Sequence, residues 1–293
     1  MQSSHNVILY YKYVTVEDPA ALRDAQWKLC SELGLTGRVI LAEEGINGTL
    51  EGESESIEVY CETLKKDARF ADIVFKKSEG TGSSFPKLSI KVRNEIVSSG
   101  VKGVDPSKES APYITPDELH KWYEEGREFY VLDMRNDYEL AVGCLDKTVP
   151  SGMNTFRDVQ KLPEKVKDLG DRPVVSVCTG GVRCEKATAH VLKQGGLKNV
   201  YQLQGGIDQY VKKYPGKHFK GKLYVFDGRV VMDTSSSDVV GHCELCEEKC
   251  ERYINCKEAE CNRHFICCTS CSSEDRGECC GRCVSSATSH TKE

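Results

Sequence analysis

The residues with the most evident chemistry form a short loop, Cys178-Thr-Gly-Gly-Val-Arg-Cys184. An apolar strand is expected just before it, over 173–178, and a helix is expected over 184–194. Ligands of open α/β sheets bind at the carboxyl ends of strands. The two glycines allow backbone N–H groups to point inward, and these groups, the helix N-terminus and Arg183 all favour a thiolate at Cys178. The loop is therefore expected to cradle an anionic sulfur or an oxyanion.

The length of this loop distinguishes two kinds of enzyme. Four residues separate Cys178 from Arg183, one fewer than in the Cys-x5-Arg loop of protein tyrosine phosphatases, which is sized for phosphate. A shorter loop suits a smaller, sulfur-centred group. We therefore expect Cys178 and Arg183 to be catalytic. The expected substrate-binding positions of the loop are Thr179, Gly180, Gly181 and Val182.

Two roles are possible for Cys184. It could resolve an oxidised Cys178 as a disulfide, or it could be a packed thiol in the first turn of the helix.

The end of the chain is dense in cysteine. Eleven of the 16 cysteines lie between Cys243 and Cys283. Two Cys-x2-Cys pairs, separated by 21 residues, have the spacing of a tetrahedral zinc site, and further cysteines suffice for a second ion. The expected ligands are Cys243, Cys246, Cys268 and Cys271 for the first site and Cys256, Cys261, Cys280 and Cys283 for the second, with His264 as an alternative ligand.

One or two structural zinc ions would supply folding energy to this short segment, because it lacks a large apolar core. An iron–sulfur cluster and free thiols in a disordered tail are the alternatives, since thiolates alone do not identify the metal.

Composition narrows the class of protein. The 293 residues carry a formal net charge of −5, with a pI of about 5.9, which argues against a surface devoted to nucleic acid but permits local basic patches. No apolar run reaches the roughly 18 residues of a membrane helix. The start of the chain has no basic region followed by an apolar one, so we expect no secretory signal and a cytoplasmic protein. In that reducing compartment, the tail cysteines are better metal ligands than disulfides.

Two domains are expected to position these residues. Residues 1–98 read as a ferredoxin-like, split βαβ domain, and residues 98–112 read as a linker. The elements of the first domain are expected as strands 7–13, 37–42, 46–50, one within 71–77 and 86–92, with helices 18–32 and 54–67.

In residues 113–215, short apolar strands at 129–133, 173–178 and 200–203 alternate with helices, which predicts a parallel α/β sheet. Thr115-Pro116 begins the first of these helices. Residues 240–285 form a third, cysteine-rich metal-binding module, so the chain as a whole belongs to the α/β class.

A basic stretch lies between the second domain and the tail. No acidic residue occurs between Asp208 and Asp227, and the lysines there, including Lys217 and Lys220, are interleaved with aromatic rings. This pattern suits phosphate pairing and base stacking, so Lys217 and Lys220 are expected to contact RNA. An ordinary solvated lysine face is the alternative.

Several motifs resemble a known family. Residues 113–215 resemble a rhodanese domain through the Asp133-x-Arg135-x3-Glu139 element, the Cys178 loop and Gly205-Gly206. Residues 41–47, 87–97 and 178–186, with the cysteine tail, resemble the rhodanese-type tRNA uridine(34) hydroxylases. This resemblance implies an oxygen-dependent conversion of the wobble uridine in the tRNA anticodon loop to 5-hydroxyuridine. It also implies that Cys178 is the active-site cysteine, of the persulfide-carrying type.

Other functions remain open at this point. The alternatives are a sulfurtransferase that carries sulfane sulfur as a Cys178 persulfide, and a non-enzymatic rhodanese fold with a zinc-bound tail. The additional N-terminal domain and the basic stretches favour the hydroxylase. Cys178 could attack uridine at C6 directly or act as a persulfide. Asp133, Arg135 and Glu139 are expected to be structural rather than to contact substrate.

The oxygen-activating group is not evident from the sequence. It contains no Gly-x-Gly-x-x-Gly nucleotide fingerprint, and no 2-His-1-carboxylate pattern is identified. The sequence specifies no oligomeric state.

Overall fold

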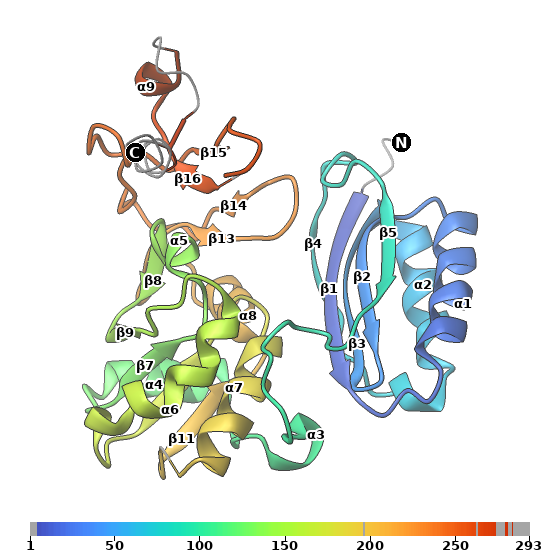
Figure 1. Cartoon of the computed structure of the whole chain (residues 1–293), viewed down its shortest axis with the longest axis horizontal. Helices are drawn as coiled ribbons and strands as arrows, with labels where there is room; N and C mark the ends of the chain where they lie inside the picture. The colour runs from blue at the N-terminus through green and yellow to red at the C-terminus, as the bar shows by residue number, and fades with distance from the viewer. Residues whose placement is uncertain (1–4, 196, 262, 274–278, 281–282, 284–293) are drawn as a thin grey trace, which may run out of the picture.

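A computed structural model describes residues 5–195, 197–261, 263–273, 279–280 and 283 (Figure 1). The first domain is a five-stranded sheet in the order β4-β1-β3-β2-β5. Its strands are β1 (His5–Tyr13), β2 (Thr36–Ala42), β3 (Gly45–Glu53), β4 (Lys76–Glu79) and β5 (Leu88–Val92). Helices α1 (Pro19–Glu32) and α2 (Ser54–Lys65) cover the face that is turned away from the rest of the chain (Figure 1). The split βαβ prediction is confirmed, and β5 adds an edge strand parallel to β2.

One predicted strand is displaced. The strand expected within 71–77 begins at Lys76, because a 3-10 turn, Ala68–Phe70, follows α2 first. The Asp67 carboxylate accepts the Arg69 N–H and starts this turn, which places Phe70 in the core. The alternation of the strand then turns the Lys76 side chain inward and the Lys77 side chain outward.

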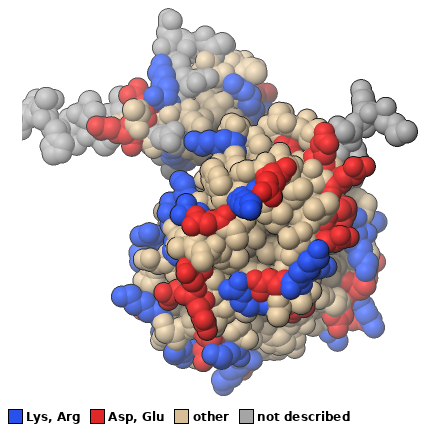
Figure 2. All heavy atoms as spheres, turned by 90° about the vertical axis from the view of Figure 1, so that its right-hand side faces the viewer, with Lys and Arg blue, Asp and Glu red and all other residues tan. Residues whose placement is uncertain are grey.

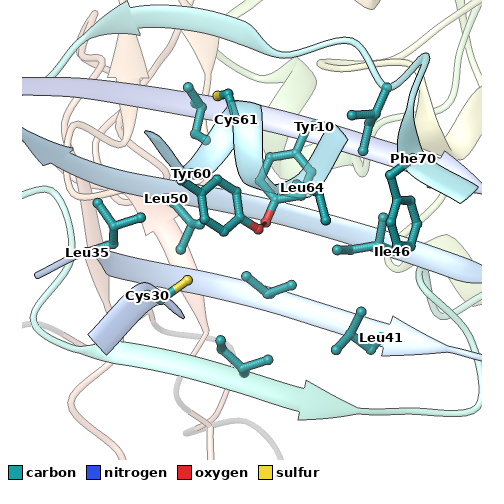
Figure 3. Close-up of a cluster of buried hydrophobic side chains, with 14 of the residues drawn as sticks. Tyr10, Cys30, Leu35, Leu41, Ile46, Leu50, Tyr60, Cys61, Leu64 and Phe70 are labelled. Carbon is teal, nitrogen blue, oxygen red and sulfur yellow. Dashed lines mark hydrogen bonds between the residues drawn. The ribbon is translucent and has the colours of Figure 1, made fainter. Parts of the chain in front are cut away.

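The core of the first domain lies between its sheet and its two helices (Figure 3). It contains a buried polar group: the hydroxyls of Tyr10 and Tyr60 lie 2.5 Å apart, and Tyr60 donates to Gln26 Oε1 at 2.6 Å. Cys30 and Cys61 also lie in this core, where burial raises the pKa of the Cys30 thiol to about 12 and that of Cys61 to about 11. These two cysteines are therefore inert packed thiols.

The second sheet is parallel throughout, in the order β6-β11-β10-β7-β9. Its strands are β6 (Tyr113–Ile114), β7 (Tyr130–Asp133), β9 (Thr148–Pro150), β10 (Val174–Val177) and β11 (Val200–Leu203). Helices α4 (Pro116–Glu124) and α8 (Gly206–Lys213) pack on one face, and α7 (Val182–Lys193) packs on the other. Both faces are thus covered, and the central strand β10 is fully buried, as the run of apolar residues predicts.

Local signals explain two helix starts of this domain. At α4, which begins where Thr115-Pro116 predicted, Thr115 Oγ1 accepts the Glu118 N–H while the Glu118 carboxylate accepts the Thr115 N–H, and the two bonds form a capping box. Helix α7 begins at Val182, two residues earlier than predicted, because Gly181 takes a left-handed conformation (φ +103°) and acts as its N-cap.

Shorter elements complete this domain and connect it to the tail. The remaining helices are α3 (Pro106–Glu109), α5 (Asp137–Leu140) and α6 (Leu162–Lys165), with 3-10 turns at Phe156–Lys161 and Lys167–Leu169. Three antiparallel two-stranded pairs are also present: β8 (Gly143–Leu145) with β12 (Phe219–Gly221), β13 (Leu223–Tyr224) with β14 (Val231–Met232), and β15 (Tyr253–Asn255) with β16 (His264–Ile266). Helix α9 (Thr269–Ser273) follows the last of them.

The three parts of the chain contact one another. The tail packs on the second domain through Ile266 against Val142 and Tyr224. The first domain docks through its β1 and β4 strands: Tyr13 Oη donates to the Val182 carbonyl at 3.0 Å, and Arg229 donates to Ser78 Oγ at 3.1 Å. No described helix is long and apolar enough to cross a membrane.

The surface over the α1 and α2 side of the molecule is mixed in charge (Figure 2). Basic and acidic side chains are interspersed there, without a large area of one sign. This face therefore lacks the concentrated positive charge by which proteins attract nucleic acid.

Candidate functional site

Cys178 lies at the carboxyl end of β10, and its side chain is fully buried. The Gly181 N–H donates to Cys178 Sγ at 3.0 Å. The loop lies directly against β1 of the first domain: a Cβ on Gly180 would lie 2.7 Å from Leu9 Cδ2, and one on Gly181 would lie 2.7 Å from Tyr11 Oη. The two glycines are therefore required both for the curl of the loop and for the close docking of the first domain.

The Gly205-Gly206 motif supports the loop from the other side. Gly206 has a φ of +72°, and a Cβ there would lie 2.7 Å from the carbonyl oxygens of both Cys178 and Thr179. The first amides of α8 then bind these carbonyls, with Ile207 N–H to Cys178 O at 2.9 Å and Asp208 N–H to Thr179 O at 3.0 Å. The carbonyls of Cys178 and Thr179 are thereby both satisfied, so α8 fixes the course of the loop.

Arg183 is held by a buried ion pair. Its guanidinium donates to both carboxylate oxygens of Glu139, at 2.6 and 2.8 Å, and lies 5.4 Å from the ring centre of Phe226. Arg135, fully buried, pairs with Asp133 at 2.7 Å and donates to the Glu139 carbonyl at 3.3 Å. Asp133, Arg135 and Glu139 thus fix the position of Arg183, in accord with the structural role expected for them.

The electrostatics of the loop favour a sulfur anion. Burial alone would raise the pKa of Cys178, but the hydrogen bond from Cys184, the charge of Arg183 and the backbone N–H groups of Gly181 and Arg183 lower it to about 5. Burial and the neighbouring Cys178 sulfur raise the pKa of Cys184. These contacts favour the thiolate form at Cys178 and the neutral thiol at Cys184.

Sequence reasoning missed a group of residues that the first domain contributes to this site. Lys76 is 7 % exposed, donates to the Gly180 carbonyl and lies 4.9 Å from the centre of the Tyr11 ring. Glu185 Oε1 accepts hydrogen bonds from Tyr11 and Tyr113, each at 2.7 Å. The sequence signal for Lys76 is weak, because Lys76 and Lys77 are adjacent residues of the same type. Only the register of β4 shows which of the two side chains points inward.

A cavity of about 440 Å³ lies at the Cys178 loop, between the two domains. Its lining includes Cys178 and four of the residues expected around it: Thr179, Gly180, Val182 and Arg183. Much of the remaining lining is aliphatic or small and polar, and it includes the carboxylates Asp208 and Asp227, which pair with Lys212 and Arg229. Its other cationic and aromatic side chains are Arg38, Lys76, Arg157, Tyr11, Phe156 and Phe226. Arg38 and Arg157 are exposed and form no ion pair with any described residue.

Two of the expected RNA contacts lie elsewhere. Lys217 and Lys220 are exposed but do not line this cavity, and Lys220 Nζ lies 3.3 Å from Asp146 Oδ1. The phosphate contact predicted for them stays a prediction. Sequence reasoning did not identify the cavity cations Arg38 and Arg157, because they come from segments that only the fold brings together.

The eight tail cysteines expected as ligands form two groups of four. Within each group all four sulfur atoms lie within 4.8 Å of one another. The sulfur–sulfur distance is 3.7 Å for Cys246–Cys268 and 3.6 Å for Cys256–Cys283. A tetrahedral zinc with bonds of about 2.3 Å has ligand sulfurs roughly 3.8 Å apart, so the donor sets fit that ion.

The order of ligands along the chain is interleaved. The pairs 243/246 and 268/271 form one group, and the pairs 256/261 and 280/283 form the other. Each group therefore closes a loop that contains two cysteines of the other group, so the formation of one site constrains the segment that carries part of the other. His264, the alternative ligand, is in neither group, and its Nδ1 lies 2.9 Å from Asn255 Oδ1.

The fold also assembles a 2-His-1-carboxylate group that sequence analysis did not identify, from His120, Glu124 and His218. His218 Nε2 lies 3.1 Å from Glu124 Oε1, and its Nδ1 lies 3.3 Å from Asp146. The histidines are distant in sequence, so only the fold brings them together. None of the three lines the Cys178 cavity.

Family models match three segments of the chain. A UPF0176 acylphosphatase-like domain matches residues 5–96, a rhodanese-like domain matches residues 115–213, and a rhodanese C-terminal model matches residues 220–284. The first two correspond to the two sheets, and the third spans the connector and the cysteine groups.

Full-length relatives are similar over nearly the whole chain. A tRNA uridine(34) hydroxylase of Cytophaga hutchinsonii is 40% identical, over 95% of this chain and 89% of the relative. The enzyme of the same name from Onion yellows phytoplasma is 41% identical, over 90% and 87%. That from Staphylococcus carnosus is 38% identical, over 96% and 90%. The similarity thus extends through both domains and into the tail.

Proposed function

Since the chain belongs to the tRNA uridine(34) hydroxylase family, we propose that it converts the wobble uridine of tRNA to 5-hydroxyuridine, with Cys178 as the catalytic residue and molecular oxygen as co-substrate. The observation that carries the role of Cys178 is its environment: one buried sulfur, with a pKa lowered to about 5, at a cavity lined by cations and aromatic rings. A thiolate at neutral pH is a strong nucleophile and the form that carries persulfide sulfur.

The cavity supplies what a flipped-out nucleotide needs. Bases of single-stranded RNA loops bind by stacking on aromatic or guanidinium planes, while Arg and Lys bind the flanking phosphates. Phe226 is 47% exposed and packs on Arg183, so it offers a ring beside the reactive sulfur. Arg38 and Arg157, exposed at the same cavity, provide charge for the backbone of the anticodon loop.

Two chemical routes start from the Cys178 anion. In the first, the thiolate attacks C6 of the uridine, an S–C6 bond forms, and the electron pair of the C5=C6 bond moves toward C5, which becomes the nucleophilic carbon. In the second, Cys178 carries a persulfide. A 5-fluorouridine tRNA separates them: the first route predicts a covalent adduct between the tRNA and Cys178, located by peptide mass spectrometry. An active enzyme that forms no adduct excludes the direct attack.

For the tail we propose two structural zinc ions, each held by one of the two four-cysteine groups. The fit of both donor sets to a tetrahedral S4 site supports this, and zinc would supply the folding energy of the tail. A tRNA substrate and thiols that must stay reduced both support a cytoplasmic location.

A sulfurtransferase is the alternative activity, since the same loop would carry sulfane sulfur as a Cys178 persulfide. The docking of the first domain on the loop favours the hydroxylase, because a small sulfur acceptor needs no cavity between two domains lined by Arg38 and Arg157.

The test uses a strain that lacks the gene, complemented with the wild type or with Cys178→Ser and grown under ¹⁸O₂. We expect the 5-hydroxyuridine-derived nucleosides of tRNA to return only with the wild type, and to carry ¹⁸O when measured by mass spectrometry. Modification that persists in the deletion strain would overturn the function. Modification restored by Cys178→Ser would overturn the role of the cysteine, and label taken from water instead would overturn oxygen as the co-substrate.

A further inference from the structure

A lysine of the first domain is buried against the cysteine loop of the second. Lys76 lies at the start of β4 and is 7 % exposed, whereas its neighbour Lys77 is exposed and pairs with Glu58. The Lys76 ammonium donates to the Gly180 carbonyl and lies 4.9 Å from the Tyr11 ring centre. Among the described residues, no carboxylate forms an ion pair with it.

A buried ammonium without a carboxylate partner is costly, so the surroundings must supply negative charge in another form. Burial lowers the pKa of Lys76, and negative charge at Cys178, then at Asp208 and Glu185, opposes that effect. Asp208 already pairs with Lys212 at 2.8 Å. Burial raises the pKa of Glu185, whose Oε1 accepts two tyrosine hydroxyls. The sulfur of Cys178 is the remaining anion.

The other cation of the loop is committed elsewhere. Both outer nitrogens of Arg183 bind the Glu139 carboxylate, so much of its charge is balanced within the second domain. Lys76 has no such partner, and its charge is available to the sulfur. The two cations therefore differ in their partners. Arg183 is paired with a carboxylate of its own domain, whereas Lys76 reaches the loop from the other domain without a carboxylate partner among the described residues.

We infer that Lys76 is a positioning residue for the reaction: its ammonium holds the Gly180 carbonyl and adds a second counter-charge, beside that of Arg183, to the Cys178 anion. The sulfur site is then complete only when the first domain is docked, which gives that domain a part in the chemistry besides any contact with tRNA. This inference rests on the proposed role of Cys178.

The test measures the thiolate itself in the full-length protein. The ultraviolet absorbance of the Cys178 thiolate is followed against pH as the difference between each protein and its Cys178→Ser counterpart, so that the tail thiolates cancel. We expect a midpoint near pH 5 for the wild type. Lys76→Met should raise the midpoint by about one pH unit, the low end for loss of a nearby opposite charge, and Lys76→Arg should stay near the wild type.

Two further variants separate charge from structure. Lys77→Met is the matched control, one residue away on the outer face of β4, and should leave the midpoint unchanged. Lys76→Gln keeps a donor for the Gly180 carbonyl without the charge, so it should behave as Lys76→Met does. Circular dichroism and thermal melting verify the fold of each variant.

An unchanged midpoint in either folded variant, Lys76→Met or Lys76→Gln, would overturn the inference. If Lys76→Met fails to fold, Lys76→Gln against Lys76→Arg decides it. If both neutral variants unfold while Lys76→Arg folds, Lys76 is a structural interface residue and the inference fails. The titration needs no tRNA and no oxygen. A hydroxylation test that fails in the wild type would therefore overturn the proposed function without changing the titration result.

Discussion

Cys178 and the tail cysteines hold negative sulfur in opposite ways. At Cys178 a single sulfur accepts the Gly181 amide within a fixed loop, and the cations of Arg183 and Lys76 come from two different domains. In the tail, sulfurs gather four at a time within 4.8 Å of one another. The loop stabilises its anion with hydrogen bonds and nearby positive charge. In the tail, a bridging ion would use those lone pairs as ligands.

The difference predicts that the two regions respond to different perturbations. The loop depends on a preformed fold, because its amides and its ion pair are in place before any ligand arrives. With the proposed zinc ions the tail would depend on metal, because four unbridged thiolates repel one another. A perturbation of one region should therefore leave the other intact, and each experiment below tests that independence.

Removal of metal should give the largest effect. Chelation would remove the roughly 10–16 kcal/mol that a structural zinc typically supplies, so limited proteolysis should cut within residues 240–285 while the Cys178 titration stays unchanged. Metal analysis should find about two zinc ions per chain, and about one in Cys246→Ser, whereas Cys250→Ser, outside both groups, should keep two. A brown protein that absorbs near 400 nm would contradict zinc and indicate iron and sulfide.

Substitution of the reactive sulfur comes next. Cys178→Ser should lower hydroxylation of tRNA by at least about 10⁴-fold, as expected for loss of a nucleophile, without change in zinc content. Cys144→Ser is the control, because Cys144 is a half-buried thiol of the same domain that does not line the cavity, and burial raises its pKa. Comparable loss in both variants would indicate a general fold defect instead of a specific role for Cys178.

The sequence predicted the parts of this site whose residues are close together in the chain. It missed the parts whose residues come together only on folding. The Cys178 loop and the two Cys-x2-Cys pairs of the first group were evident from their spacing, whereas spacing indicated the ligands of the second group only weakly. The first domain was predicted in class, yet its docking on the loop was not, since nothing in residues 76–77 marks which lysine turns inward. The rim residues Arg38 and Arg157 were missed for the same reason: they meet only after folding.

Loss of the buried Glu139–Arg183 ion pair should have a smaller effect than loss of the Cys178 sulfur. Glu139→Gln leaves the Arg183 charge buried without its carboxylate, and removal of one partner of a buried pair costs roughly 3–5 kcal/mol. Urea unfolding measures this loss. Glu128→Gln, at an exposed pair with Arg172, should change stability by less than about 1 kcal/mol. A stable Glu139→Gln protein with unchanged activity would show that Arg183 needs no such support.

Stability should also depend on pH through Cys178. A thiol whose pKa falls from 9.0 to about 5 on folding favours the folded state fully above pH 9, and that contribution disappears as the pH falls through 5. The difference in unfolding free energy between the wild type and Cys178→Ser should therefore grow from pH 5 to pH 9. A difference that stays constant over this range would mean that Cys178 is a neutral thiol in the folded protein.

The smallest expected effects concern tRNA binding, where individual charges contribute one phosphate contact each. Arg157→Glu, at the rim of the cavity, and the charge reversals Lys217→Glu and Lys220→Glu, outside it, should each weaken binding and reduce its salt slope by about one. Lys28→Glu, at an exposed position of α1, is the control. If only Arg157→Glu weakens tRNA binding, the RNA contacts the cavity and not residues 217–220. If only the lysine variants weaken it, the main RNA contact lies along residues 217–220.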